Sequence, residues 1–399
     1  MAYLTGFDPR FEEALLVVEP AGDPVVLVGN ECMGMAQAAP LPMEVRLFPG
    51  FSLPGQPDRV GSSLARSPAE AGVGRRTRVG AVGWKELDSP ARLDLPSFIV
   101  DDLRRLAGDD ELVSNATHLL IDPSDGLRVI NEVAQLAYFE SAACHTSSGL
   151  RRLLFELETG MTEQEAVQLL RWNGSPLSCH LMLTAGDRAR LGLLSPGNRP
   201  IERGDPFTVA FGIWGALNCR AGFVVADETE LPPDIADYVD RLVAPYFAAV
   251  VEWDEALRVG QTGGALWEIV ARRLGDPFFG IFLNPGHQIH LDEWVNTPVR
   301  PQSPIELRSG MALQVDLIPA TGTPYFTTNI EDGIALADRD LRARIAERYP
   351  EAWARIQARR RFMGDVVGID LNEDVLPLSN IPAYLQPFLL EPGRVMTVE

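Results

Sequence analysis

The sequence is poor in cysteine and has no closely spaced pair of cysteines. It contains four in 399 residues, at positions 32, 144, 179 and 219. Zinc ribbons and redox motifs need neighbouring thiols, and small secreted domains stabilised by disulfides need a higher density of them. The first residues also lack the basic and then apolar stretches of a secretory signal. We therefore expect reduced thiols and a cytoplasmic protein.

Long hydrophobic runs and surplus positive charge are missing too. No run of about 18 apolar residues occurs, so the sequence predicts no membrane-spanning helix. Lys and Arg number 35 against 55 Asp and Glu, which gives a net charge of −20 at pH 7. Binding to nucleic-acid phosphates or to an anionic membrane surface depends on clustered positive charge. We expect neither partner.

The sequence does contain enough apolar residues for two globular domains. Hydrophobic residues make up 46% of the 399 positions, and this length favours two domains with cores of their own. A turn cluster, Asp122-Pro123-Ser124-Asp125-Gly126, interrupts the apolar pattern. We place the domains at residues 1–122 and 123–399. In the first domain, β-rich runs alternate with turns and a helical stretch, as in a layered α/β unit, at 14–18, 24–28, 78–82 and 96–106.

The second domain begins with helical patterns and continues with strands. Apolar residues recur at helical spacing in 128–157, and Thr162 with Glu165 three positions later predicts a capping box that opens the next helix. Strands are expected at 180–185, 207–211 and 222–226, helices at 233–256 and from 263 onward, and an extended tail at 376–382.

One histidine and two acidic residues stand in well-defined local motifs. His287 lies in Gly-His-Gln-Ile-His, Asp316 in Leu-Gln-Val-Asp-Leu and Glu331 in Asn-Ile-Glu-Asp-Gly. An imidazole beside two carboxylates is able to hold a divalent ion or to move a proton. No carboxylate occurs between Asp205 and Asp227, where the sequence predicts a pair of strands.

The order and context of these motifs resemble the pita-bread superfamily of methionine aminopeptidase, aminopeptidase P, prolidase and creatinase. The resemblance extends to the N-terminal third, where Tyr3-Leu4-Thr5-Gly6-Phe7 and Val79-Gly80-Ala81-Val82-Gly83-Trp84 match creatinase and aminopeptidase P motifs. It implies an α/β (α+β) protein with a creatinase-like N-terminal α/β domain and a C-terminal pita-bread domain. In that domain an antiparallel sheet is covered by helices, and the active site lies on its concave face.

The resemblance also implies that the usual pair of metal ions is not held here. The peptidases bind two divalent ions through two Asp, one His and two Glu. His287, Asp316 and Glu331 match three of these positions, whereas Ala210 and Ala221 occupy the positions of the Asp pair. Two neighbouring dications need several anionic ligands. We expect no metal cofactor; the alternative is one divalent ion held by His287, Asp316 and Glu331.

Three functional interpretations remain open. Creatinase works without metal, so this resemblance favours a metal-independent hydrolase that cleaves a C–N bond with His287 as general acid and base and with Asp316 and Glu331 holding a substrate nitrogen. The alternatives are a catalytically inactive pseudo-peptidase that serves as a binding module, and a mononuclear Xaa-Pro peptidase. Two departures weigh against peptidase activity: Trp294 stands where aminopeptidase P and prolidase have a second histidine, and Asn329 stands where prolidases have an arginine.

The surroundings of the site are less clearly marked. We expect His290, Trp294 and Trp214 to line the substrate pocket, with His290 either contacting substrate or filling space vacated by metal. Arg46 and Arg220 are candidates for binding a substrate carboxylate by location only. The resemblance further implies a small molecule or a short peptide as the ligand, and a homodimer.

Overall fold

The computed structural model describes residues 1–57, 69 and 72–398, and it divides into two compact units. The units are Met1–Leu119 and Leu120–Glu399, and the boundary predicted after residue 122 lies close to this division. Each unit combines strands and helices, which confirms the predicted α/β (α+β) class. Within the described residues no helix is both long and apolar enough to span a bilayer.

The described residues of the first unit form two small sheets. Strands β1 (Ala14–Val17), β2 (Val25–Val28) and β3 (Glu44–Leu47) form one sheet, antiparallel and then parallel. A second sheet pairs β4 (Val79–Ala81) with β5 (Val113–Asn115). The helices are α1 (Ala2–Thr5), α2 (Met33–Gln37) and α3 (Ser97–Ala107). The strands and the helix expected near 14–18, 24–28, 78–82 and 96–106 are therefore confirmed.

The second unit is built on a seven-stranded sheet in the order β6-β7-β8-β11-β10-β9, with β12 also paired to β11. Every neighbouring pair is antiparallel. The strands are β6 (Met182–Ala185), β7 (Pro206–Ile213), β8 (Ala216–Phe223), β9 (His287–Gln288), β10 (Ala312–Asp316), β11 (Asn329–Leu336) and β12 (Val375–Pro377). The expected tail near 376–382 thus begins as a strand, because β12 extends this sheet.

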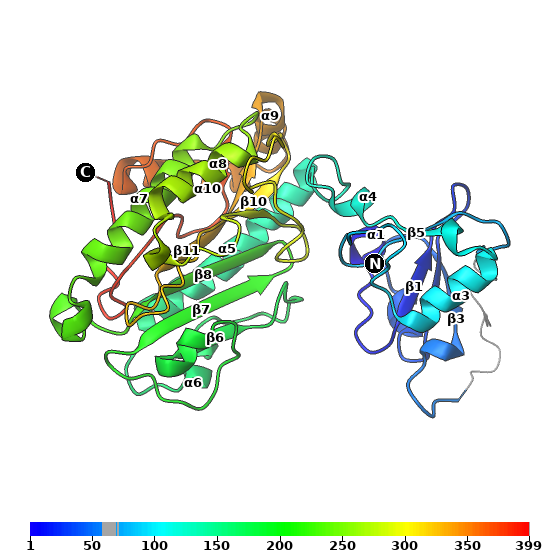
Figure 1. Ribbon diagram of the computed structural model, residues 1–399, viewed down its shortest axis with the longest axis horizontal. Coiled ribbons are helices and arrows are strands. Elements are labelled where there is room, and N and C mark those ends of the chain that lie inside the picture. The colour runs from blue at the N-terminus through cyan, green and yellow to red at the C-terminus, as the bar shows by residue number, and fades with distance from the viewer. Residues whose placement is uncertain (58–68, 70–71, 399) are drawn as a thin grey trace. The chain divides into compact units, whose positions relative to one another are not determined.

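Helices accompany this sheet, and several of them begin where the sequence signals predicted. The Thr162 hydroxyl accepts from the Glu165 N–H while the Glu165 carboxylate accepts from the Thr162 N–H, which confirms the predicted capping box. Figure 1 shows α7, α8 and α10 along one side of the sheet. The helices of this unit are α4 (His118–Ile121, at the boundary), α5 (Val133–Glu156), α6 (Glu163–Gln168), α7 (Ala244–Ala256), α8 (Gly263–Leu274), α9 (Arg339–Arg348) and α10 (Pro350–Phe362).

The helix predicted from residue 128 starts five positions later, at Val133. Asn131 donates from its backbone N–H and from its side-chain amide to the carbonyl of Gly310, at 2.8 and 2.9 Å. These bonds hold the preceding residues in a non-helical conformation, and Glu132 then caps the helix. A tertiary contact to a distant residue therefore overrides the local helical pattern.

Arg220 stabilises the sheet from the face opposite to Cys219 and Ala221, its neighbours on β8. Its guanidinium is fully buried, lies 2.8 Å from Asp332 and donates to the carbonyls of Ile381 and Tyr384 at 2.7 and 2.9 Å. All of these partners belong to the fold, so Arg220 is a structural residue rather than a binder of substrate carboxylate. Arg46, the other candidate, pairs with Glu44 on β3 in the first unit.

Replacing Arg220 with methionine is expected to lower the free energy of unfolding by about 3–5 kcal/mol, because Asp332 would remain buried without its cation. Urea denaturation measures the loss. Arg203→Met is the matched control, since Arg203 pairs with Glu230 at the surface and such pairs contribute about 1 kcal/mol or less. Equal losses in the two variants would contradict a structural role for the buried pair.

Candidate functional site

The residues of the candidate site come together because the strand register places them on one face of the sheet. His287 on β9 lies opposite Gln314 on β10, and Asp316 lies opposite Glu331 on β11. Glu331 in turn lies opposite Cys219 on β8. Opposed residues share a face and alternate residues along a strand return to it. His287, Asp316 and Glu331, which are far apart in sequence, therefore converge on the same face.

Ala210 and Ala221 lie on this same face. Ala210 on β7 is opposite Cys219, and Ala221 follows Cys219 by two residues on β8. Both alanines are buried. The two positions at which the resemblance requires aspartates thus present methyl groups on the face that carries the acidic residues.

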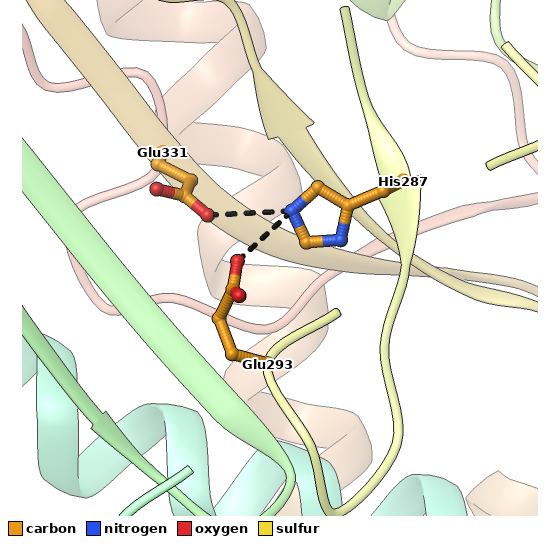
Figure 2. Close-up of side chains that lie close together, drawn as sticks. All are labelled: His287, Glu293 and Glu331. Carbon is orange, nitrogen blue, oxygen red and sulfur yellow. Dashed lines mark ion pairs between the residues drawn. The ribbon is translucent and has the colours of Figure 1, made fainter. Parts of the chain in front are cut away.

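His287 lies among three carboxylates, and Figure 2 shows two of them, those of Glu293 and Glu331. Its Nε2 is 3.2 Å from Glu293 Oε1, 3.6 Å from Glu331 Oε1 and 3.8 Å from Asp316 Oδ2. His287, Asp316 and Glu331 are buried, whereas the Glu293 side chain is 26% exposed. The cluster therefore combines one imidazole with three acidic groups in an environment that largely excludes water.

Glu293 is the one member of the cluster that sequence reasoning missed. It lies outside the strands, in the segment that follows β9, so strand alternation gives no information about its direction. The only available signal was its position six residues after His287, in the adjacent Asp292-Glu293 pair.

The acidic surroundings control the charge of His287. Burial by itself lowers the pKa of the imidazole, but Glu293, Glu331 and Asp316 together raise that pKa to about 10. Burial raises the pKa of Asp316 to about 6 and that of Glu331 to about 8. At neutral pH the imidazole and the Glu331 carboxyl group therefore both carry protons, and Asp316 is ionised.

The three aromatic residues expected to line the pocket lie in different places. Trp294 stacks on the His287 ring, with centroids 4.1 Å apart and planes 22° from parallel. His290 packs edge-on against Phe139, at 5.2 Å, and its Nε2 is 3.3 Å from the Gln135 amide. Burial lowers the pKa of His290 to about 3, so this imidazole is neutral. Trp214 lies in the two-residue turn between β7 and β8.

Apolar and sulfur-containing side chains surround the alanine on β7. Ala210, Leu217 and Cys219 form a buried cluster against which Cys179 and Met182 pack. Burial, followed by the nearby Glu331 and Asp316, raises the pKa of Cys219 well above its usual value. Burial, followed by Glu293 and Glu331, raises that of Cys179 to about 12. Both thiols therefore stay neutral and act as part of an apolar wall beside the carboxylates.

The donor set does not fit a pair of metal ions. Two dications need bridging and terminal carboxylates on both sides, and Ala210 and Ala221 supply no donor atom. A single ion is a closer fit. Ligand atoms of His287, Glu293 and Glu331 lie within 4.8 Å of one another, and this set contains Glu293 where the sequence suggested Asp316. Buried His287 Nε2, Asp316 Oδ1 and Glu331 Oε1 also lack well-aligned hydrogen-bond partners within the protein.

Solved structures with a similar arrangement of elements include peptidases. The prolidase from Pyrococcus horikoshii OT3 matches with a TM-score of 0.63 and 17% identity, over 84% of this chain and 88% of that one. The chain has the pita-bread fold. The Xaa-Pro dipeptidase from Bacillus anthracis (TM-score 0.60, 16% identity, 85% and 88% covered) and the X-Pro aminopeptidase from Thermotoga maritima MSB8 (0.56, 14%, 85% and 89%) have the same fold.

Comparison of sequences alone finds no match: no protein-family model and no curated protein resembles this chain significantly. At identities of 14–17%, the likeness establishes the pita-bread fold and leaves the activity to be argued from the site. The predicted superfamily resemblance is thus confirmed for the fold.

We expect the stability of the protein to depend on pH because of the buried cluster. Comparison with a variant that has the same shape as Glu331 but no ionisable group reveals this dependence. The pKa of Glu331 is raised from 4.5 to about 8 by folding. Its contribution to stability is therefore fully present below pH 4.5 and is lost as the pH rises toward 8. We expect wild type to lose stability relative to Glu331→Gln across this window, as measured by urea denaturation in EDTA-containing buffer. Parallel stability curves for the two proteins would contradict the raised pKa.

Proposed function

We propose that this protein is a metal-independent hydrolase that cleaves a C–N bond of a small molecule or short peptide, with His287 as general acid and base. One observation carries the proposal: His287 Nε2 lies within 4 Å of three carboxylates, on a sheet face where alanines occupy both remaining ligand positions. Such a site is able to supply and accept protons without an ion.

The protonation states suggest how the steps are divided. Water adds to the carbon of the C–N bond, and the bond breaks as imidazolium His287 gives its proton to the departing nitrogen. The neutral imidazole that this transfer leaves accepts the proton released by water, which restores the starting state. Ionised Asp316 stabilises the imidazolium form of His287. Protonated Glu331 is able to donate a hydrogen bond to the substrate oxygen or its equivalent, and Glu293 is able to accept one from a substrate N–H.

Hydrolysis assays with and without EDTA test this proposal. Suitable probes are creatine-like amidines, N-acyl amino acids and Xaa-Pro dipeptides. We expect turnover in at least one class, at a rate that EDTA leaves unchanged. Turnover that requires added Mn²⁺ or Zn²⁺ would refute metal independence. Binding of these probes without any turnover would instead favour an inactive pseudo-peptidase acting as a binding module.

A mononuclear Xaa-Pro peptidase is the second candidate, favoured by the closeness of His287, Glu293 and Glu331. One imidazole and two carboxylates would be sufficient ligands for a catalytic zinc ion. Elemental analysis of protein purified without chelator separates the two candidates. One equivalent of Zn, Mn, Fe or Co per chain, lost on mutation of Glu293 to Gln, would favour the peptidase.

A further inference from the structure

A pocket of about 420 Å³ in the second unit is separate from the His287 cluster. It is lined by residues of α5, α10 and the segment 380–384, including Arg151, Phe155, Arg355, Arg359 and Tyr384. Arg220 donates to the carbonyls of Ile381 and Tyr384, and its side chain lies on the sheet face opposite to Cys219 and the carboxylates. The pocket wall is therefore anchored to the reverse face of the sheet.

Positive charge is concentrated in this pocket. Arg355 binds Glu140 through Nε and Nη2, at 2.9 and 2.6 Å, and Arg359 Nη2 lies 2.8 Å from the same carboxylate. The Glu140 side chain is fully buried, so it fixes both guanidinium groups from beneath. None of the described residues that line the pocket is acidic. Three arginines against one glutamate leave a surplus of two positive charges, in a chain whose net charge is −20.

Arg151 is the arginine best placed to receive a ligand. It is exposed, it forms no ion pair with any described residue, and its guanidinium lies 4.7 Å above the centre of the Phe155 ring. Stacking on an aromatic face holds the group in place while its N–H donors remain directed outward. Arginine used in this way commonly recognises phosphate or carboxylate.

The same pocket offers a flat apolar surface. The rings of Phe155 and Tyr384 are stacked, with centroids 6.2 Å apart and planes 29° from parallel, and Phe362 also lines the pocket. The volume falls within the range of about 300–1,000 Å³ that is usual for small-molecule sites. Arginine donors beside aromatic faces form an environment for a molecule that is anionic at one end and planar at the other.

We propose that this pocket binds a small molecule that carries a phosphate or carboxylate group on a planar ring. Arg151 and Arg355 contact the anionic group, and the ring packs against Phe155 and Tyr384. This site is distinct from the His287 cluster, so the proposal does not depend on the hydrolase activity.

Isothermal titration calorimetry of the full chain with phenyl phosphate, benzoate and inorganic phosphate tests the site. We expect one molecule of phenyl phosphate or benzoate to bind per chain, and the stronger of the two identifies the anionic group. Arg151→Gln is expected to weaken this binding about tenfold or more. Arg361→Ala is the matched control: Arg361 is exposed on α10, and it does not line the pocket.

A second variant separates the two halves of the ligand. Phe155→Ala removes the contact with the ligand ring. It is therefore expected to weaken the binding of the aromatic probes more than the binding of inorganic phosphate. Three outcomes would overturn the proposal: no binding of either aromatic probe at millimolar concentration, equal weakening by Arg151→Gln and Arg361→Ala, or inorganic phosphate binding as tightly as phenyl phosphate. Arg151→Gln and Phe155→Ala are expected to fold, because both side chains are partly exposed. Circular dichroism of the two variants checks this.

Discussion

Replacing Ala210 and Ala221 with aspartate is expected to create a metal requirement, which our proposal does not assign to the natural chain. Both positions are buried on the face that carries Asp316 and Glu331. Two more carboxylates there would be uncompensated in metal-free protein, which should lower the free energy of unfolding by about 3–5 kcal/mol. Mn²⁺ would then bind between the strands, and at about 100 times its Kd each bound ion would restore about 2.7 kcal/mol.

Thermal denaturation with EDTA and with Mn²⁺ measures both effects, and elemental analysis gives the stoichiometry. The matched control replaces both alanines with asparagine, which has the same size as aspartate without its charge. That variant should show no stabilisation by Mn²⁺. If the folded aspartate variant is equally insensitive to Mn²⁺, then the two positions do not face the cluster in the way that the strand register indicates.

Replacing His287 with glutamine is expected to lower kcat by about 10²–10⁴, with a smaller effect on KM. Glutamine fills similar space and retains hydrogen-bonding groups, but it is unable to carry the proton held by the imidazole between the carboxylates. The measurement uses whichever probe the hydrolysis assays identify as a substrate. His180→Gln is the control, because His180 is exposed and its Nε2 bonds to the Leu193 carbonyl. Retention of more than a tenth of kcat in His287→Gln would exclude a proton-transfer role.

The fold and the centre of the site were predictable because they depend on short-range signals. The Thr162–Glu165 capping box and the order of the motifs around His287, Asp316 and Glu331 are readable in sequence. The strand expected at 222–226 is instead observed at Ala216–Phe223. In an antiparallel sheet, alternate residues of one strand and the residues directly opposite them on neighbouring strands lie on the same face. Knowledge of the fold therefore predicts the convergence of these three residues before any side chain is placed.

The remaining features depend on tertiary contacts that sequence patterns do not encode. Glu293 reaches His287 from a segment without regular structure, so no periodicity indicates its direction. Arg220 appeared to be a candidate for substrate binding by location, and only its pairing with Asp332 on the reverse face identifies its structural role. The arginine pocket likewise brings together α5 and α10, which are separated by about half of the chain.

The late position of strand β12 in the chain affects how the second unit folds during synthesis. It pairs with β11, and the nearby carbonyls of Ile381 and Tyr384 accept hydrogen bonds from the guanidinium of Arg220. Arg220 is synthesised much earlier than these partners. Domains generally begin to fold from the N-terminus while translation proceeds. The first unit is free to do so, but the sheet beneath the His287 cluster stays incomplete until residue 384 has left the ribosome. The apolar faces of this sheet are therefore fully covered only late in translation.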